Sequence, residues 1–209
     1  MKKYDILNKI GQEKIISIVR VDTEDQAERA VSALLEGGLT CVELAFTTPY
    51  AHSIIEKWSK KYEGAKLLLG AGTVLDPETA RIAILSGAKF MITPALNTEV
   101  IKMCNRYGIP AIPGVATATE ALTALEAGAD VVKLFPATQF KPSFMKDIKA
   151  PLTNLEIAPT GGIGAHNIKE WIDAGAFACG VGGSLFKGLK EGNYKQITQN
   201  AVALKEALK

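Results

Sequence analysis

The sequence predicts a single α/β domain over residues 1–209, folded as a (β/α)8 TIM barrel with parallel strands. Eight short apolar runs alternate with segments of helical pattern, and successive runs begin about 20–26 residues apart, which leaves room for one helix in each gap. The runs are apolar at consecutive positions, as is typical of parallel strands buried on both faces. No linker or change of composition divides the chain. An open doubly wound sheet is the alternative.

The strands are expected at the apolar runs. These are Ile15–Val19, Cys41–Leu44, Leu67–Ala71, Phe90–Thr93, Ala111–Pro113, Val131–Phe135, Glu156–Thr160 and Phe177–Gly180. Four of the runs follow a glycine and a small residue, as in Gly87-Ala88 and Gly128-Ala129. Glycine just past a helix takes the left-handed cap conformation, so each of these turns predicts the end of a helix.

Helices are expected between the strands, and capping residues mark their starts. The expected helices are Thr23–Glu36, Pro49–Tyr62 behind Thr48, Glu78–Leu85 behind Asp76-Pro77, three that begin at Asn97, Thr117 and Asn167, Lys141–Ile148, and Asn193–Leu208. The segment from Met1 to Ile10 carries charge throughout and lacks an apolar core. It is therefore not expected to act as a secretory signal.

The charge balance argues against two classes of partner. With 24 basic and 22 acidic residues the net charge is +2, which gives no electrostatic case for binding nucleic acid or an anionic membrane. The longest uncharged apolar stretch is too short and too rich in glycine to span a bilayer. We therefore expect a cytoplasmic protein with no nucleic-acid or membrane partner.

Cysteine and histidine content argues against common metal sites. Three cysteines, with no Cys-x-x-Cys pair, predict a reducing compartment, no disulfide framework and no thiolate zinc site. His52 and His166 are far apart in sequence, which excludes a histidine-rich metal site but leaves a carboxylate-bound ion open. Both fall at the starts of expected helices, where we interpret them as surface or capping residues.

The most informative residue is a lysine inside an apolar strand. Lys133 interrupts the run Val131–Phe135, where its ammonium would lose its water at a cost of several kcal/mol. Burial lowers the pKa of a lysine, and the resulting free amine can attack a ketone to form a Schiff base. Alternatively, Lys133 packs its stem along the strand and keeps its ammonium in water.

Two further charged residues stand near strand ends, where the active site of such a barrel lies. Glu43 belongs to an apolar strand, and burial would raise the pKa of its carboxyl toward the range useful for a general acid or base. Alternatively, Glu43 pairs with an internal cation, Arg20 or Lys133, since structural ion pairs also shift pKa values. Arg20 could bind a substrate carboxylate through two parallel hydrogen bonds, or could simply be exposed.

Hydroxyls and glycines follow other strands. Thr47, Thr73 and Thr160 stand at strand ends, where each is as readily a helix cap or a turn residue. Two segments, Thr160-Gly161-Gly162 and Gly182-Gly183-Ser184, follow the last two strands with helical starts expected behind them. Bare N–H groups and a helix N-terminus attract an anion, so this arrangement favours a phosphorylated ligand. Glycines that only relieve crowding at turns are the alternative.

Taken together, six stretches resemble the bacterial class I aldolases that cleave 2-keto-3-deoxy-6-phosphogluconate (KDPG) and, in some members, 4-hydroxy-2-oxoglutarate (KHG). The stretches are Gly70-Ala71-Gly72-Thr73-Val74-Leu75, Thr93-Pro94, Ile112-Pro113-Gly114, Val132-Lys133-Leu134-Phe135-Pro136-Ala137, Pro159-Thr160-Gly161-Gly162-Ile163 and Gly182-Gly183-Ser184. The strings Lys-Leu-Phe-Pro-Ala and Pro-Thr-Gly-Gly-Ile in this order are specific. The resemblance runs from Ile15 to Phe186.

The resemblance implies a lyase that needs no metal or cofactor, folds as an eight-fold barrel, assembles as a homotrimer and serves the Entner–Doudoroff pathway. It implies that Lys133 forms the imine with the C2 ketone, that Glu43 moves the protons, and that the products are pyruvate and glyceraldehyde 3-phosphate. Substrate binding is expected of Arg20, Thr47, Thr73, Pro94, Phe135 and Thr160, and phosphate binding of Gly161, Gly162, Gly182, Gly183 and Ser184.

One position departs from the family, and other substrates and roles stay open. Many members carry arginine four residues after the glutamate, where this chain has Thr47, and Arg20 is the residue that we expect to replace it. The 6-phosphogalactonate epimer and unphosphorylated KHG are alternative substrates. A phosphate-binding isomerase or synthase, with Lys133 as an ion-pair partner, and a non-catalytic sugar-phosphate sensor are alternative functions. The presence of both Lys133 and Glu43 argues against the sensor, because a binding protein needs no buried amine.

Overall fold

The computed structural model describes residues 2–64 and 67–209, so Met1 of the N-terminal segment discussed above lies outside it. The strands are β1 (Ile15–Val19), β2 (Cys41–Ala45), β3 (Leu68–Gly72), β4 (Met91–Ile92), β5 (Ala111–Ile112), β6 (Gly114–Val115), β7 (Val131–Leu134), β8 (Glu156–Pro159) and β9 (Cys179–Val181). The helices are α1 (Lys3–Glu13), α2 (Glu24–Glu36), α3 (Ala51–Lys61), α4 (Pro77–Leu85), α5 (Thr98–Arg106), α6 (Ala118–Glu126), α7 (Ser143–Lys149), α8 (Ile168–Asp173) and α9 (Tyr194–Glu206), with a 3₁₀ turn, η1 (Ala137–Gln139). Within the described ranges, none of these helices is long and apolar enough to cross a membrane.

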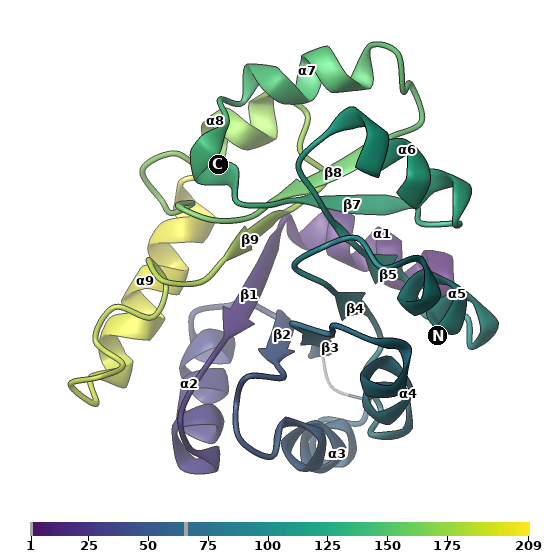
Figure 1. Ribbon diagram of the computed structural model, residues 1–209. Helices are drawn as coiled ribbons and strands as arrows, with labels where there is room; N and C mark the ends of the chain where they lie inside the picture. The colour runs from purple at the N-terminus through teal and green to yellow at the C-terminus, as the bar shows by residue number, and fades with distance from the viewer. Residues whose placement is uncertain (1, 65–66) are drawn as a thin grey trace.

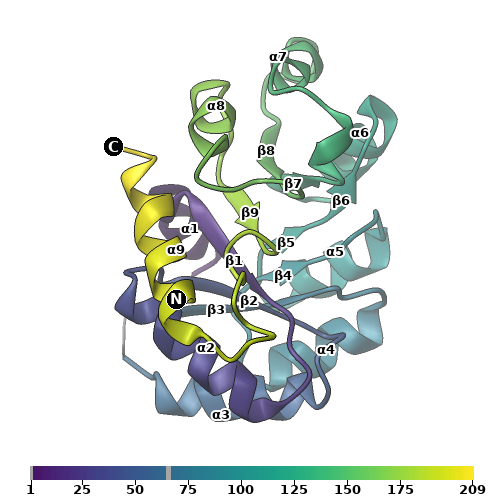
Figure 2. The same cartoon turned by 90° about the vertical axis from the view of Figure 1, so that its left-hand side faces the viewer.

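All the paired strands run parallel, which confirms the predicted α/β class. Six form one sheet in the order β5-β4-β3-β2-β1-β9, and β6-β7-β8 form another. The predicted fifth strand, Ala111–Pro113, ends one residue earlier as β5, because Pro113 has no N–H to donate to a ladder, and a further short strand, β6, follows it. At the other junction, Thr160 just past β8 makes a parallel bridge to Gly180 of β9. Helices surround the curved strands on the outside (Figure 1), and α9 lies beside α2 (Figure 2).

Alternate residues of each strand serve two different cores, because successive side chains point to opposite faces of a sheet. On β2, Val42 and Leu44 face outward and join the main core beneath the helices. Cys41 faces inward and belongs to a smaller cluster enclosed by the strands. The next inward position on β2 is Glu43, which is 1% exposed.

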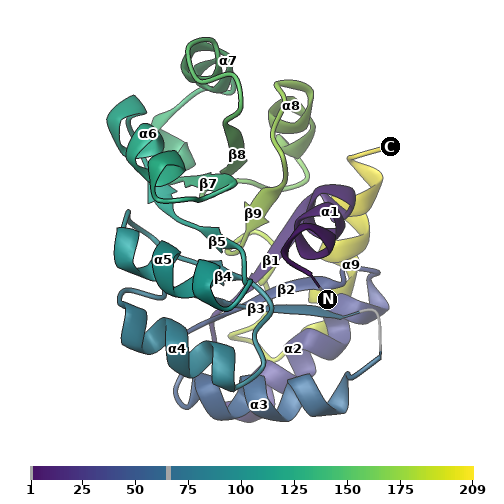
Figure 3. The ribbon, with the colours of Figure 1, turned by 90° about the vertical axis from the view of Figure 1, so that its right-hand side faces the viewer.

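Helix α1 seals the amino ends of the strands. Its buried residues Ile6, Leu7 and Ile10 belong to the inner cluster, and α1 lies next to β1 in Figure 3. Their partners are inward residues near the starts of the strands, namely Ile16, Cys41, Leu68, Phe90, Ile92, Ile112, Val131, Ala158 and Ala178. This helix was not predicted, because its segment carries charge throughout and has only a narrow apolar stripe. With the amino ends covered, the carboxyl ends are left for a cavity.

The start of α3 differs from the prediction. The helix begins at Ala51, and Tyr50 precedes it in the left-handed conformation, with a φ of 56°. Thr48 is not a helix cap, so that prediction was wrong. Its hydroxyl instead accepts a hydrogen bond from the N–H of Val21, 3.3 Å away, and so joins the loops that follow β1 and β2. The predicted caps that accept helix N–H groups are Thr23, Asp76, Asn97 and Thr117, and Asn193 does the same at the start of α9.

Candidate active site

A cavity of about 600 Å³ opens where the carboxyl ends of the strands meet. Residues from within or just after the strands line it, and the loops after β8 and β9 contribute the largest share. The lining residues are Ile18, Arg20, Glu43, Thr73, Pro94, Lys133, Phe135, Thr160, Gly161, Gly162, Ile163, His166, Gly180, Gly182, Gly183, Ser184, Phe186 and Lys187. Apart from Thr47, every residue singled out as a candidate in the sequence is among them.

The cavity also has lining residues that the sequence analysis did not assign to it. Thr47 is exposed and is not among the lining residues. His166 is exposed, as its interpretation as a surface residue predicted, and it lines the cavity together with Lys187. The signal that could have found them is their position, since each follows one of the two glycine segments by a few residues.

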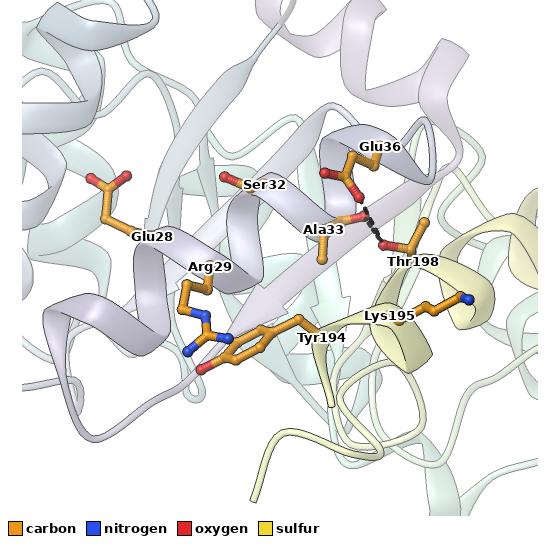
Figure 4. A pocket seen from close by; sticks show the side chains of 8 residues that line it. All are labelled: Glu28, Arg29, Ser32, Ala33, Glu36, Tyr194, Lys195 and Thr198. Atoms are coloured by element: carbon orange, nitrogen blue, oxygen red, sulfur yellow. Dashed lines mark hydrogen bonds between the residues drawn. The ribbon is translucent and has the colours of Figure 1, made fainter. Parts of the chain in front are cut away.

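A second hollow, of about 630 Å³, lies between α2 and α9 (Figure 4). There the Arg29 guanidinium stacks over the Tyr194 ring at 4.1 Å, and the Thr198 hydroxyl donates to the carbonyl of Ala33 at 3.2 Å. Glu28 accepts hydrogen bonds from Trp58 and Lys61. These polar groups already have protein partners, so few of them are available to bind or transform a ligand.

Lys133 and Glu43 are buried at the bottom of the cavity at the strand ends. Each stands two residues past a member of the inner cluster, Val131 on β7 and Cys41 on β2, so the two charged side chains occupy one layer directly above that cluster. Lys133 is 7% exposed and Glu43 is 1% exposed. The low exposure of Lys133 argues against the alternative in which its ammonium reaches bulk water.

Burial shifts both groups toward their neutral forms. Desolvation lowers the pKa of Lys133, with the Glu43 carboxylate opposing and the Arg20 guanidinium assisting this shift. Desolvation likewise raises the pKa of Glu43, against the influence of Lys133 and Arg20. Burial therefore favours the free amine of Lys133 and the protonated carboxyl of Glu43, which suits nucleophilic attack followed by proton transfer.

A glycine makes room for the Glu43 carboxyl. A Cβ on Gly72 of β3 would lie 1.5 Å from Glu43 Oε1, so any side chain at this position would displace the carboxyl. Within residues 2–64 and 67–209, Glu43 Oε2 has no hydrogen-bond partner, although it is buried. A buried oxygen without a partner is costly, so this one is suited to bond with a bound molecule.

Arg20 and Thr73 stand near the amine. Arg20 Nη2 lies 3.5 Å from Thr73 Oγ1, and the charge of Arg20 influences the pKa values of both Lys133 and Glu43. Thr73 has a φ of 56°, a strained value for a residue with a branched side chain. A guanidinium and a hydroxyl so placed could hold a carboxylate beside the carbon that the amine attacks.

Glycine loops form the other side of the cavity. Gly161 and Gly162 have φ values of 110° and 68°, which residues with a side chain rarely adopt. In the described part of the chain, the N–H groups of Gly161, Gly162, Gly183 and Ser184 donate to no protein acceptor. Free N–H groups in a concave loop can bind an anion.

The helices expected behind the glycines contribute less than predicted. After β9 the chain forms turns through residues 183–192, and α9 begins only at Tyr194, so the expectation of a helical start behind Gly182-Gly183-Ser184 was wrong. After β8, α8 spans only Ile168–Asp173. The Asn167 side chain does not cap α8 but bonds to the Gly164 N–H and the Gly162 carbonyl, which braces the loop.

Metal ligation does not account for this cluster of residues. Among residues 2–64 and 67–209, no three histidine, cysteine or carboxylate side chains are grouped so that they could hold a metal ion. That the site works without a metal or cofactor stays a prediction.

Sequence comparison assigns nearly the whole chain to one family. The sequence model of the family described as KDPG and KHG aldolase matches residues 6–200. The chain is 39% identical to the 2-dehydro-3-deoxy-6-phosphogalactonate aldolase of Escherichia coli K12, over 83% of this chain and 84% of that protein. It is 36% identical to the 2-dehydro-3-deoxy-phosphogluconate aldolase of Treponema pallidum, over 92% of each.

A solved structure agrees with the sequence comparison. The fold is similar to that of the KDPG aldolase from Legionella pneumophila, with a TM-score of 0.87, 26% identity and 98% of each chain covered. In that crystal structure pyruvate was captured as a covalent carbinolamine intermediate. A carbinolamine is the adduct that an amine forms with a ketone.

Proposed function

The chain belongs to the KDPG and KHG aldolase family, and we propose that it cleaves 2-dehydro-3-deoxy-6-phosphogluconate into pyruvate and glyceraldehyde 3-phosphate through a Schiff base on Lys133. The observation that carries this proposal is the buried Lys133–Glu43 pair at the bottom of the cavity, with the pKa of the amine lowered by desolvation. The reaction is one step of the Entner–Doudoroff pathway, and cleavage of KHG to pyruvate and glyoxylate is a further activity to be tested.

The first stage joins the substrate to the enzyme. The free amine of Lys133 attacks the C2 ketone, and the oxygen takes up a proton to give a carbinolamine. Glu43, whose pKa is raised by burial, gives a proton to the departing hydroxyl, and water leaves as the iminium forms. The carboxylate left on Glu43 then faces the new cation.

The second stage breaks the bond between C3 and C4. Glu43 accepts the proton of the C4 hydroxyl, the C3–C4 electron pair moves toward the iminium, and the aldehyde departs. The iminium acts as an electron sink, so the remaining fragment is an enamine and not a free carbanion. Protonation at C3 and hydrolysis of the imine release pyruvate and restore Lys133.

The remaining lining residues are proposed to hold the two ends of the substrate. Arg20 and Thr73 bind the carboxylate, which the 3.5 Å separation of their polar atoms supports. Arg20 would thus replace the arginine that many family members carry at the position of Thr47. Thr47 itself has no assigned contact with the substrate. Pro94, Phe135 and Thr160 shape the walls. The phosphate binds to the glycine loops at Gly161, Gly162, Gly182, Gly183 and Ser184.

Larger-scale features complete the proposal. We infer that the two sheets form one closed (β/α)8 barrel in a single domain, which the Thr160–Gly180 bridge and the single residue between β5 and β6 support. A cytoplasmic location is supported by Cys41, Cys104 and Cys179, which are all free and buried. A homotrimer is supported by the family resemblance and by exposed apolar side chains at α4, namely Leu75, Ile82 and Leu85.

Borohydride trapping tests the Schiff base directly. The protein is incubated with pyruvate and borohydride, and intact mass and peptide mapping locate the adduct. We expect one pyruvyl adduct, on Lys133, and none in Lys133→Met. Lys102→Met, which changes an exposed lysine of α5 outside the cavity, is the matched control and should trap normally. Trapping should weaken as the pH falls through the lowered pKa of Lys133, because protonation removes the nucleophile.

The outcomes separate the competing functions. Failure to trap pyruvate on the folded protein would exclude the Schiff-base mechanism and favour a phosphate-binding isomerase or a sensor. Coupling pyruvate release to lactate dehydrogenase then measures turnover of the gluconate substrate, of its galactonate epimer and of KHG. Both epimers belong in the assay, because relatives named for each match this chain at similar identity.

A further inference from the structure

We propose that the His166 and Lys187 side chains bind the substrate phosphate and set the preference of this enzyme for phosphorylated aldehydes. This inference rests on the proposed function and assigns a specificity role to two residues whose positions in sequence did not suggest one. Both line the cavity beyond the glycine loops, His166 in the loop after Gly162 and Lys187 in the turn after Ser184.

His166 and Lys187 lie at the same part of the cavity wall, although 21 positions separate them in the sequence. A smaller hollow of about 240 Å³, beside α9, shares His166, Ser184 and Lys187 with the active-site cavity. These three side chains therefore form a common wall and can be reached from the active-site side.

The geometry around one glycine brings His166 close to the glycine loops. A Cβ placed on Gly164 would lie 3.0 Å from both His166 Nδ1 and Ser184 Oγ. The imidazole and the Ser184 hydroxyl therefore approach the same point from two loops. Ser184 Oγ donates to the Ile163 carbonyl at 2.6 Å, so this contact holds the two loops together.

The charge of a phosphate group requires charged side chains here. A phosphate monoester carries between one and two negative charges at neutral pH, since its second pKa is about 6. The free N–H groups of the glycine loops supply only partial charges, and no long helix begins directly behind either loop. Arg20, another basic residue of the cavity, stands by Thr73 and influences the Lys133 pKa, which places it at the amine end.

Lys187 is available to supply that charge, and His166 is available to add a hydrogen bond. Within the described residues, Lys187 forms no salt bridge and His166 makes no hydrogen bond to another side chain. Histidine and lysine both donate hydrogen bonds to phosphate oxygens when they are protonated. The cavity therefore has a cation at each end, which matches a substrate with a carboxylate at one end and a phosphate at the other.

Two acceptors that differ only in the phosphate provide the test. The condensation of pyruvate with glyceraldehyde 3-phosphate is compared with its condensation with glyceraldehyde, in His166→Ala, Lys187→Ala and the double variant. Each single change should lower kcat/KM for the phosphorylated aldehyde about tenfold or more, mainly through KM, since a hydrogen bond to a charged group is lost. With glyceraldehyde, kcat/KM should stay within about twofold, because that acceptor never used the contact.

Matched controls come from the same residue types. His52→Ala changes the other histidine, an exposed residue of α3, and Lys190→Ala changes an exposed lysine in the turn that contains Lys187. Both should leave kcat/KM for both aldehydes unchanged. Lys187→Arg should retain most of the preference, because the guanidinium keeps the charge.

Each result decides the inference. Equal losses with both aldehydes would reveal a structural role and overturn it, as would unchanged kinetics with glyceraldehyde 3-phosphate. Inorganic phosphate is a second probe: it should inhibit the wild-type enzyme and inhibit the double variant at least tenfold less strongly. Trapping of pyruvate on Lys133 in the double variant separates failure of this inference from failure of the aldolase proposal.

Discussion

At the scale of single residues, the site depends on two ionisable groups, Lys133 and Glu43, whose neutral forms are favoured by burial. Lys133 and Glu43 each sit one layer above the inner apolar cluster, and desolvation is the largest influence on the pKa of both. Each group also favours the charged form of the other, which limits the shifts. A lysine buried without a carboxylate partner would lose its proton more readily, but the site would then lack a group to move protons.

Gly72→Ala is expected to disable proton transfer. Its new Cβ would occupy the position of Glu43 Oε1, so the carboxyl must rotate away from the substrate. We expect kcat to fall by about 10²-fold or more, the usual contribution of a positioned general acid or base. Steady-state kinetics with the phosphorylated substrate measure this.

The comparison variant is Gly70→Ala, on the same strand. There the new Cβ would meet the Phe90 ring at 2.4 Å and not the Glu43 carboxyl. Overpacking of this kind costs about 1–3 kcal/mol of unfolding free energy. We expect Gly70→Ala to be less stable but to retain most of its kcat, and equal kcat losses in the two variants would contradict the role assigned to Gly72.

At the scale of secondary-structure elements, the two ends of the strands have different roles. The amino ends are occupied by α1, whose buried face completes the inner cluster, while the carboxyl ends carry the ionisable groups and glycine loops. The same strands thus contribute apolar packing at their amino ends and reactive groups at their carboxyl ends. At the carboxyl ends, Thr73, Gly161 and Gly162 all have positive φ.

Ile10→Ala tests how much the packing of α1 against the inner cluster contributes to stability. Ile10 is fully buried in the inner cluster, so its truncation should lower the free energy of unfolding by about 2–5 kcal/mol. Lys9→Ala, at the exposed neighbouring position, should change it by less than about 0.5 kcal/mol. Chemical denaturation measures both. At temperatures where Ile10→Ala is folded, its kcat should match that of the wild type, and a specific loss of kcat would show that α1 also shapes the site.

At the scale of the whole molecule, the exposed apolar residues gather in part at one helix. Leu75, Ile82 and Leu85 belong to α4 or the loop before it and are 59%, 46% and 69% exposed. The Arg81 guanidinium stacks on Tyr107 at the end of α5 at 4.1 Å, which holds the neighbouring surface in place. Burying such side chains against a second copy would stabilise an assembly.

Leu85→Lys tests the proposed trimer and its interface together. Light scattering should give the wild type a mass three times that of one chain, and Leu85→Lys should shift it toward a single chain, because a charge would be buried at the contact. Val202→Lys, at an exposed apolar position of α9, should leave the mass unchanged. A wild-type mass of one chain would refute the trimer, and a trimeric Leu85→Lys would exclude α4 from the interface.

Much of the fold and the site followed from the sequence alone. Apolar runs, glycine turns and helix caps are local patterns, and they predicted the alternating strands and helices within a few residues. The carboxyl ends of parallel strands share one edge, so the order of the strands was enough to predict that Lys133, Glu43 and the glycine segments meet there. The departure at Thr47 was likewise visible in the sequence.

Tertiary structure alone decided the features that depend on which distant residues face each other. The layer shared by Glu43 and Lys133, the room that Gly72 leaves for the carboxyl, and the covering of the amino ends by α1 all depend on register and packing between segments far apart in the chain. So does the meeting of His166 with Lys187, two polar residues in separate loops. Local patterns determine the conformation of a segment, but its neighbours in space are determined only when the whole chain buries its apolar surface.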